Sequence, residues 1–356
     1  MAGVRRPPAV ARVLERVTAT AREHEMFRPD DLVLVSVSGG PDSVCLLYSL
    51  WHLRRLFKIK LAVFHFDHKL RPDSHKDAAY VERLADRLQL PFSLREAIDA
   101  PGKGVSVEAW ASVTRGNATN EVRKEIGAGV VAEGHTLDDQ AETVLLNLIR
   151  GRGLEGVTGI WPTSLGLPRH VEPLIDVERT EVEAFCGALH LRPRRDPSNA
   201  DTRLLRNALR LKGFPALERA TGRGVKRSIA RSADLLRADR TELYTQAVRA
   251  MNEVLVGRWS YRDMTFDAAT LRSLPGPVAS RAVRLAVYQV MEREDVAPWS
   301  KQAVDAVLDL ARGRPGRKRD LSGGLNAWRY REYVQLSRPS PNADGSDGPR
   351  PGKGKT

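Results

Sequence analysis

The sequence is poor in the residues that build disulfide frameworks, metal clusters or membrane spans. Only two of its 356 residues are cysteine, Cys45 and Cys186, and they stand far apart with no Cys-x-x-Cys or Cys/His spacing. Neither a disulfide framework nor a zinc or iron–sulfur site is therefore supported. No stretch approaches the length of about 18 apolar residues that a membrane span needs, and no apolar segment follows the basic start. We expect no membrane span and a cytoplasmic location.

Acidic residues are in the minority. The chain has 57 Lys and Arg against 44 Asp and Glu, which gives a formal net charge of +13. Such a charge attracts phosphate backbones and speeds encounter with them, so nucleic acid is a better partner than a small metabolite. A basic tail alone would produce the same excess, but Lys and Arg are spread along the whole chain.

Strand and helix patterns alternate through the first part of the chain. We expect strands at Leu32–Val37, Leu61–Phe66, Pro91–Ile98, Val130–Ala132 and Val171–Val177. We expect helices at Val10–Phe27, Val44–Trp51, Ser74–Leu90, Ser106–Ile126, Thr136–Arg150 and Arg179–Leu191. This alternation predicts an α/β fold with a doubly wound parallel sheet.

The pattern changes after Leu204, where it becomes mainly helical. We therefore predict a catalytic domain over residues 1–213 and a smaller, mainly helical domain over 214–336. Residues 337–356 are rich in Pro, Gly, Ser and charge and lack apolar periodicity, which predicts a disordered tail.

A glycine-rich loop separates the first strand from the helix after it, and it reads Ser38-Gly39-Gly40-Pro41-Asp42-Ser43. Two glycines let backbone N–H groups approach an anion, and the following helix adds the positive end of its dipole. The Walker Gly-Lys-Ser/Thr ending is absent, and Asp42 suggests instead a Mg²⁺ ion between protein and phosphates. A tight turn capped by Asp42 or Ser43 is the alternative interpretation.

Three carboxylates follow the fourth expected strand. Asp138, Asp139 and Glu142 are spaced so that they share one face of a helix near its N-terminus. They are suited to hold Mg²⁺ or to bind a substrate ammonium group. Favourable interaction with the helix dipole is the alternative explanation. However, stabilising the start of a helix does not require three acids, and these three lie at the same sheet edge as the glycine loop.

Another strand end, His65 to Arg71, supplies candidates for nucleotide binding. Phe66 is placed to contact an adenine above the sheet edge, and Arg71 to meet phosphate. His65 and His68 are equally well explained as ordinary polar residues at a strand end, since neither has a metal-partner spacing.

The glycine loop resembles the Ser-Gly-Gly-x-Asp-Ser signature of N-type ATP pyrophosphatases, which cleave ATP between the α and β phosphates and adenylate a substrate oxygen. A wider resemblance, to the tRNA(Ile)-lysidine synthetase family, covers roughly Leu32 to Gly213. It rests on four blocks in order: Ser38–Ser43, His65–Arg71, Gly134–Gly151, and Asp196–Asn199 with Asp201, Arg206 and Asn207.

The resemblance implies a two-step ligation. ATP adenylates the carbonyl oxygen of the wobble cytidine in the minor isoleucine tRNA, and the side-chain amine of free lysine then expels AMP. It implies ATP binding by Ser38 to Ser43 with Phe66 and His135, and Mg²⁺ binding by Asp42 and Asp138. It implies catalytic roles for Asp42, Arg115, Asp139 and Glu142, with the last two placing lysine, and tRNA binding by Arg194, Arg195, Arg203 and Arg206.

One departure from the family pattern concerns Arg115. Family members carry an arginine-rich helix with an Arg-Tyr pair, whereas this chain has Ser112 upstream and Gly116 as the neighbour of Arg115. Basic residues further along, including Arg210 and Lys226, are candidates for gripping tRNA phosphates, although a charge run is often a solvated face.

Two other functions stay open at this point. A tRNA thiolase of the same fold would use an adenylated base with a sulfur donor, but the cysteine pairs of some sulfur-inserting relatives are absent here. A non-catalytic tRNA-binding protein with a vestigial nucleotide loop would share the basic surface. The sequence does not fix the oligomeric state and is compatible with a homodimer.

Overall fold

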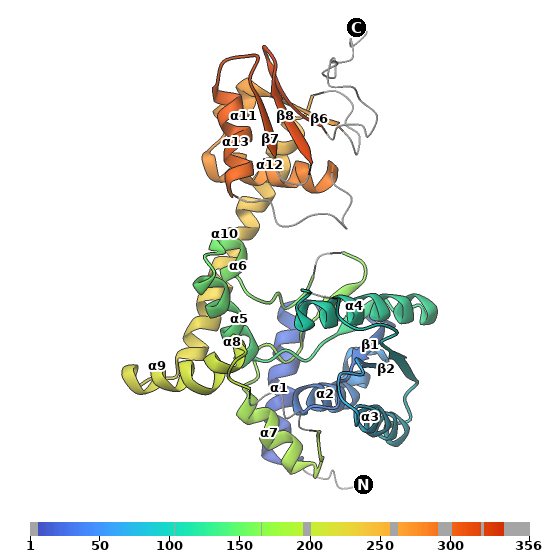
Figure 1. Ribbon diagram of the computed structural model, residues 1–356. Coiled ribbons are helices and arrows are strands. Elements are labelled where there is room, and N and C mark those ends of the chain that lie inside the picture. The colour runs from blue at the N-terminus through green and yellow to red at the C-terminus, as the bar shows by residue number, and fades with distance from the viewer. Residues whose placement is uncertain are drawn as a thin grey trace. The chain divides into compact units, whose positions relative to one another are not determined.

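The chain separates into two compact units, Met1–Leu236 and Arg237–Thr356 (Figure 1). The computed structural model describes residues 6–337 apart from 103, 165, 195–200, 257–262, 291–300, 322 and 323. The division falls inside helix α10 (Val225–Val254) rather than near Gly213 as predicted. The reason is that the start of α10 is tied to the first unit, since Lys226 pairs with Asp138 at 2.6 Å.

The first unit is built on a sheet of five parallel strands in the order β3-β2-β1-β4-β5. The strands are β1 (Leu32–Ser36), β2 (Lys60–Asp67), β3 (Phe92–Glu96), β4 (Val130–Ala132) and β5 (Arg169–Val171). The central strands β1, β2 and β4 form because short runs of apolar residues are buried on both faces of the sheet. The prediction of a doubly wound parallel sheet is confirmed.

The last strand differs from its prediction. It ends at Val171, because Pro173 cannot donate a ladder hydrogen bond and the chain turns instead, with Ile175 N–H donating to the Glu172 carbonyl at 3.1 Å. The predicted strand at Val171–Val177 is therefore wrong, and Glu172 becomes a loop residue.

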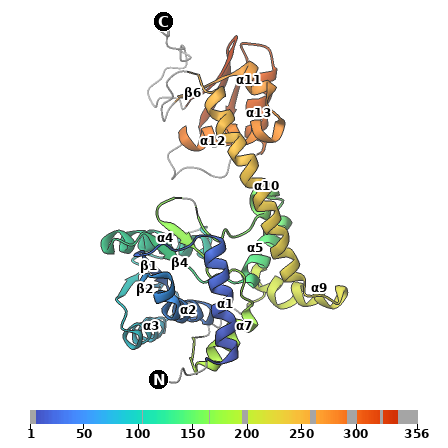
Figure 2. The same cartoon turned by 180° about the vertical axis from the view of Figure 1, so that it is seen from behind.

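Helices cover both faces of the sheet. Those of the first unit are α1 (Pro8–Glu23), α2 (Pro41–Phe57), α3 (His75–Leu88), α4 (Val107–Ile126), α5 (Leu137–Ile149), α6 (Gly153–Val157), α7 (Arg179–Ala188), α8 (Leu205–Ala208) and α9 (Phe214–Thr221), with a π-helical segment at Leu209–Gly213. The larger core packs α1, α2, α3 and α7 against one face, and α1 and α7 lie side by side (Figure 2). A smaller core packs α4 against the other face through Ala118 and Val122. Both cysteines are buried, and they belong to the larger core.

The chain order of the strands sets the position of the site. From β1 the chain moves to β2 and β3 on one side, and β4 and β5 lie on the other side. The sheet therefore switches direction between β1 and β4, and open α/β sheets bind ligands in the crevice at the carboxyl ends of such a pair. The glycine loop follows β1, and the Gly134-His135 segment follows β4.

The second unit contains a sheet that the sequence analysis missed. Four antiparallel strands in the order β6-β9-β8-β7 pack with helices around a core of their own, which includes Phe266 and Leu336. These elements are β6 (Asp263–Asp267), α11 (Ala268–Ser273), α12 (Gly276–Val290), α13 (Lys301–Arg312), β7 (Lys318–Leu321), β8 (Leu325–Arg329) and β9 (Tyr333–Ser337). Ser337, assigned to the tail, is the last residue of β9, and the rest of the predicted tail lies outside the described residues.

Gly159 fixes the loop that supports α5. Its φ is +62°, and an added Cβ would lie 2.3 Å from Oε1 of Gln140. That oxygen accepts a hydrogen bond from Ile160 N–H at 2.7 Å, so it is not free to move away. We expect Gly159→Ala to lower the free energy of unfolding by about 3 kcal/mol, from left-handed strain and the steric clash together.

Gly151→Ala is the matched control for this prediction. Gly151 also has a positive φ, +67°, but an added Cβ would meet nothing within 4 Å. It should cost only about 1 kcal/mol. Urea unfolding of the two variants measures the difference, and equal costs would show that Gln140 yields to the new methyl group.

Candidate active site

The glycine loop turns tightly between β1 and α2. Gly39 has a φ of +89°, a conformation that favours glycine. Ser43 Oγ accepts from Ser38 N–H at 3.1 Å and donates to the Gly40 carbonyl at 3.0 Å, so the two ends of the loop are held together. No side chain caps α2, and the predicted capping alternative is not observed. The first N–H groups of this helix are thus available to an anion.

Asp42 stands at the start of α2 with one carboxylate oxygen unused. Oδ2 lies 3.6 Å from Nη2 of Arg179, whereas Oδ1 is buried and has no hydrogen-bond partner within the described part of the chain. Burial raises the pKa of Asp42 to about 6, against the opposing effect of Arg179. A buried, unpaired carboxylate oxygen beside a phosphate-binding loop is the donor type that Mg²⁺ prefers, so this residue fits a magnesium ion.

The three acids of α5 are all buried. Their exposed fractions are 6% for Asp138, 8% for Asp139 and 0% for Glu142, which an unpaired carboxylate could not sustain. Asp139 has two partners of different kinds. Its Oδ2 accepts from Thr136 N–H and Oγ1 in a capping box, and its Oδ1 faces a group of arginines. Helix capping and a role in the site are therefore compatible for this residue.

Three arginines from distant parts of the chain converge on these acids. Arg179 Nη2 lies 3.2 Å and Arg206 Nη2 lies 3.3 Å from Asp139 Oδ1. Arg210 and Arg206 donate through Nε to Glu142 at 2.7 Å and 2.9 Å. Although burial opposes ionisation, Arg179 and Arg206 outweigh it and lower the pKa of Asp139. Asp139 is consequently ionised at neutral pH.

Asp138 is also fully engaged. Its Oδ1 accepts from Lys226 Nζ at 2.6 Å, and its Oδ2 accepts from the backbone N–H of Arg179 at 2.8 Å. In the magnesium role predicted for it, Asp138 would offer the ion a further lone pair of an oxygen that already accepts a hydrogen bond. In the described structure it links α5 to α7 and α10.

The loop after β1 and the helix after β4 meet at one place. Arg179 contacts Asp42 as well as Asp139, and a Cβ added at Gly134 would lie 3.3 Å from the carbonyl carbon of Asp42. The structure thus brings together the predicted phosphate loop and the predicted acidic face.

Two other predicted site residues lie apart from this cluster. Phe66 is buried in the smaller core, with its ring 4.7 Å from the ring of His68. Arg115 lies on α4, close enough to His68 to help burial lower the pKa of that histidine to about 4. Arg115 forms no ion pair with any described residue.

The arginines predicted to bind tRNA occupy different environments. Arg203 is 90% exposed in its side chain and pairs with Asp201. Arg194 pairs with Asp77 at 2.7 Å, and its backbone N–H donates to the Gly39 carbonyl at 2.9 Å. Arg206 pairs with the acids of α5, and its side chain is 32% exposed. Arg195, together with Asp196–Asn199, lies outside the described residues.

Sequence reasoning missed the residue that joins the two halves of the site. Arg179 was assigned only to a helix start, yet a cation in the first turn of a helix opposes the helix dipole. Such a residue needs an acidic partner elsewhere, and this is the signal that could have identified it. Its partners are Asp42, Asp139 and Glu142.

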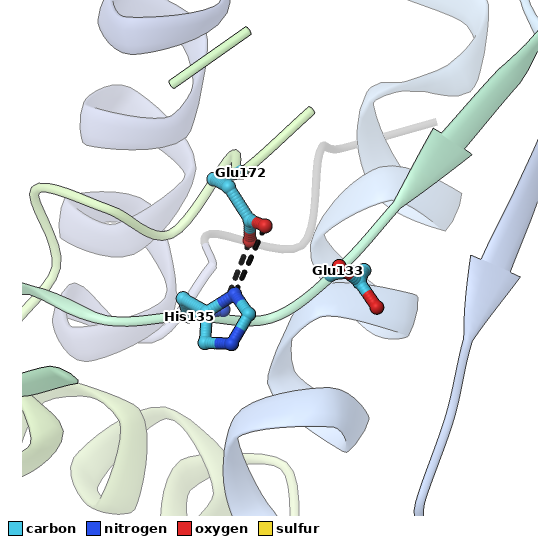
Figure 3. Close-up of side chains that lie close together, drawn as sticks. All are labelled: Glu133, His135 and Glu172. Carbon is cyan, nitrogen blue, oxygen red and sulfur yellow. Dashed lines mark hydrogen bonds and ion pairs between the residues drawn. The ribbon is translucent and has the colours of Figure 1, made fainter. Parts of the chain in front are cut away.

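His135 is held by an acid that the sequence analysis did not assign. Glu172 accepts from His135 N–H at 3.2 Å and pairs with Nδ1 of its ring at 2.9 Å (Figure 3). Burial alone would lower the pKa of His135, but the charge of Glu172 raises it to about 9. Glu133 lies nearby, so that one ligand atom from each of the three residues falls within 4.8 Å of the others. An imidazolium has no lone pair for a cation, so this group is better described as a charge pair than as a metal site.

We expect Glu172→Gln to lower the pKa of His135 well below about 9, because the largest charge that opposes burial is removed and only the smaller effects of Asp139 and Glu133 remain. In the unaltered protein the raised pKa stabilises the fold fully below pH 6.5, and this contribution is lost as pH rises through about 9. The variant should lose that pH dependence. Titration of the His135 ring by NMR tests the lowered pKa, and melting temperatures from pH 6 to 10 test the loss of pH-dependent stability. An unchanged pKa of His135 in the variant would contradict the prediction.

Comparison with known proteins gives the family. The PP-loop domain matches residues 10–217, which is more than half of the chain. A tRNA(Ile)-lysidine synthase from Caldanaerobacter subterraneus is 33% identical over 88% of this chain and 67% of its own length. The chain belongs to the tRNA(Ile)-lysidine synthase family. Another member, from Symbiobacterium thermophilum, is 38% identical over 78% of this chain and 59% of its own. The chain spans between about half and two thirds of the length of the curated relatives first matched.

A solved structure with the same fold belongs to a different enzyme. The U34-tRNA thiolase NcsA from Methanococcus maripaludis, with its [4Fe-4S] cluster, matches with a TM-score of 0.56 at 20% identity, over 64% of this chain and 79% of that chain. At this identity the match shows the fold alone. The two cysteines of the present chain are both buried, which leaves no cysteine set for such a cluster.

Proposed function

We propose that this chain is the ATP-dependent ligase that joins free lysine to the wobble cytidine of the minor isoleucine tRNA. One observation carries the proposal: Arg179 contacts both Asp42 beside the phosphate loop and Asp139 on the acidic face. A nucleotide phosphate and a substrate ammonium group can therefore be held in the same cleft. Family membership supplies the identity of the substrates.

The chemistry has two steps. The cytidine carbonyl oxygen attacks the α-phosphate of ATP, forming a C–O–P linkage and releasing pyrophosphate. The side-chain amine of lysine then attacks the ring carbon that carries this oxygen. A C–N bond forms, the C–O bond breaks, and AMP leaves with the oxygen. Adenylation is needed because it converts a poor leaving oxygen into a good one.

The glycine loop and Asp42 act in the first step. N–H groups at the start of α2 face the pyrophosphate, whose charge grows as the α–β bond breaks. Magnesium held by Asp42 would supply further charge neutralisation there. His135, kept cationic by Glu172, follows β4 at the same sheet edge and is suited to oppose a phosphate charge.

Asp139 and Glu142 act in the second step. Their negative charges suit the ammonium group of lysine, and in the described structure Arg179, Arg206 and Arg210 occupy that role. Lysine must therefore compete with guanidinium groups for these carboxylates. A consequence is that one or more of the arginines is released when lysine binds, and becomes available to phosphate.

The proposal includes a role for exposed arginines in tRNA binding. Arg203 and Arg194 are candidates, because one is largely exposed and the other joins the glycine loop to the segment that precedes Arg195. Arg115 has no ion pair with a described residue. It could stabilise the charge that develops at the α-phosphate if α4 or the substrate brings Arg115 and that phosphate together.

In the described residues no helix is long and apolar enough to cross a membrane. A cytoplasmic location and a homodimer remain part of the proposal.

Incorporation of labelled lysine tests the proposal directly. The full chain is incubated with ATP, lysine and a transcript of the minor isoleucine tRNA, with the initiator tRNA transcript as control. Lysine should enter only the first, with one AMP and one pyrophosphate released per lysine. Incorporation of sulfide in place of lysine would identify a thiolase, and tRNA binding without lysine-dependent pyrophosphate release would identify a binding protein.

A further inference from the structure

A cavity of about 620 Å³ opens beside the glycine loop and is not used by the chemistry above. Helix α3 lines one side and residues 190–194 line the other. Its wall touches the loop itself, because a Cβ added at Gly39 would lie 3.6 Å from both Tyr80 and Arg194, two lining residues. Whatever occupies the cavity is therefore adjacent to the phosphate-binding turn.

The lining is strongly cationic. Five of the lining side chains are Lys76, Arg83, Arg87, Arg192 and Arg194, and no carboxylate is among the described residues that line the cavity. Arg194 pairs with Asp77, whereas the other four form no ion pair with any residue that the structure describes. Four uncompensated cations around one hollow create a local field that binds a polyanion.

The spacing of the cations on α3 favours an extended anion. Lys76, Arg83 and Arg87 lie seven and four residues apart, which places them on one face of the helix. At a rise of about 1.5 Å per residue they extend over roughly 16 Å, the length of several phosphates in one nucleic-acid strand. A free pyrophosphate is too short to contact all three.

Tyr80 adds a feature that suits unpaired RNA. Its ring is part of the cavity wall and approaches the glycine loop, with Cδ1 3.6 Å from a Cβ added at Gly39, whereas its hydroxyl is buried toward the larger core without a hydrogen-bond partner among the described residues. In proteins that bind single strands, unstacked bases commonly stack on aromatic rings, and nearby basic side chains contact the backbone.

We propose that this α3 cavity binds the backbone of the tRNA strand that leads to the modified cytidine. The inference rests on the proposed function, because it takes tRNA as the substrate. Guanidinium groups of Arg83, Arg87 and Arg192 pair with successive phosphates, and the strand continues past Tyr80 to the glycine loop. The cavity thus orients the base toward the α-phosphate of ATP.

The test removes three charges from the cavity and three from elsewhere. The variant R83Q/R87Q/R192Q leaves Arg194 and the glycine loop intact. The control R28Q/K58Q/K60Q removes the same charge from exposed residues that precede β1 or lie at the start of β2, at the opposite edge of the sheet. Binding of the minor isoleucine tRNA transcript is measured against KCl concentration by fluorescence anisotropy, and ATP binding by calorimetry.

The cavity variant should weaken tRNA binding at least about tenfold at 150 mM salt and reduce the slope of log K against log salt by about 2 to 3. The control should reduce both much less, and neither variant should change ATP binding. Equal losses in the two variants would show a non-specific charge effect and overturn the proposal. So would unchanged tRNA binding with loss of ATP binding.

The proposed function and this inference fail in different ways. Unaltered protein that binds the transcript through the cavity but incorporates no lysine would contradict the function and leave the cavity assignment standing. Unaltered protein that incorporates lysine while the cavity variant retains full tRNA affinity would contradict the cavity assignment alone.

Discussion

Asp42→Asn is expected to reduce lysine-dependent pyrophosphate release by about 10³-fold while changing tRNA affinity less than twofold. Asp42 combines a position beside the glycine loop with a buried oxygen that has no partner among the described residues. The amide keeps the shape but removes the charge that suits magnesium, so the pyrophosphate charge is less well neutralised in the transition state. Single-turnover release of pyrophosphate, with tRNA binding measured separately, gives both quantities.

An exposed carboxylate provides the control for that experiment. Asp99 lies in the loop after β3 and is exposed, so Asp99→Asn changes the net charge by the same amount without touching the cleft. It should leave both quantities unchanged. Equal loss of reaction and of tRNA binding in Asp42→Asn would show instead that Asp42 is needed for the fold of the loop.

The parallel sheet and the position of the cleft could be predicted from the sequence because both depend on local patterns. Runs such as Leu32–Ser36 and Val130–Ala132 are mostly apolar and contain valines, which identifies them as buried strands. Once two strands are parallel, the loops after them lie at one edge. The proximity of the glycine loop to Asp139 follows from that geometry.

The partners of the acids could not be predicted in the same way. Arg206 and Arg210 stand in a basic segment, and a basic segment looks the same in sequence whether it faces RNA or a buried carboxylate. Only the chain path decides, because it brings residue 210 to residue 142 across 68 positions. Among the described arginines predicted to bind tRNA, Arg206 differs from that prediction in pairing with Asp139 and Glu142.

The sheet of the second unit was missed for a related reason. Strand β7 reads Lys-Arg-Asp-Leu, and three of its four residues are exposed. A charged strand of this length has no alternating apolar pattern to identify it, and its pairing with β8 is set by neighbours instead. The long helix α10 likewise crosses the unit boundary without a change in composition that would mark it.

Asp139→Asn should separate the two steps of the reaction. Asparagine keeps an oxygen that can accept from Thr136, so the capping box of α5 can survive, but the negative charge offered to the lysine ammonium is lost. We expect KM for lysine to rise at least about tenfold, which corresponds to about 1.4 kcal/mol, while adenylation of the tRNA continues. Accumulation of adenylated tRNA, followed with α-labelled ATP, measures the first step, and lysine incorporation measures the second.

Glu142→Gln should behave differently, because its main effect is on the fold. Glu142 is fully buried against Arg206 and Arg210, and removal of its charge leaves Asp139 to compensate both guanidinium groups. Breaking a buried pair in this way costs about 3 to 5 kcal/mol, so the melting temperature should fall before any kinetic effect can be assigned. Glu121→Gln, at an exposed position of α4, should leave stability and lysine KM unchanged.

One outcome of the Asp139→Asn experiment would contradict the proposed role of Asp139. If the variant abolished adenylation but kept normal lysine affinity, Asp139 would act on the nucleotide, and the placement of lysine on α5 would have to be abandoned.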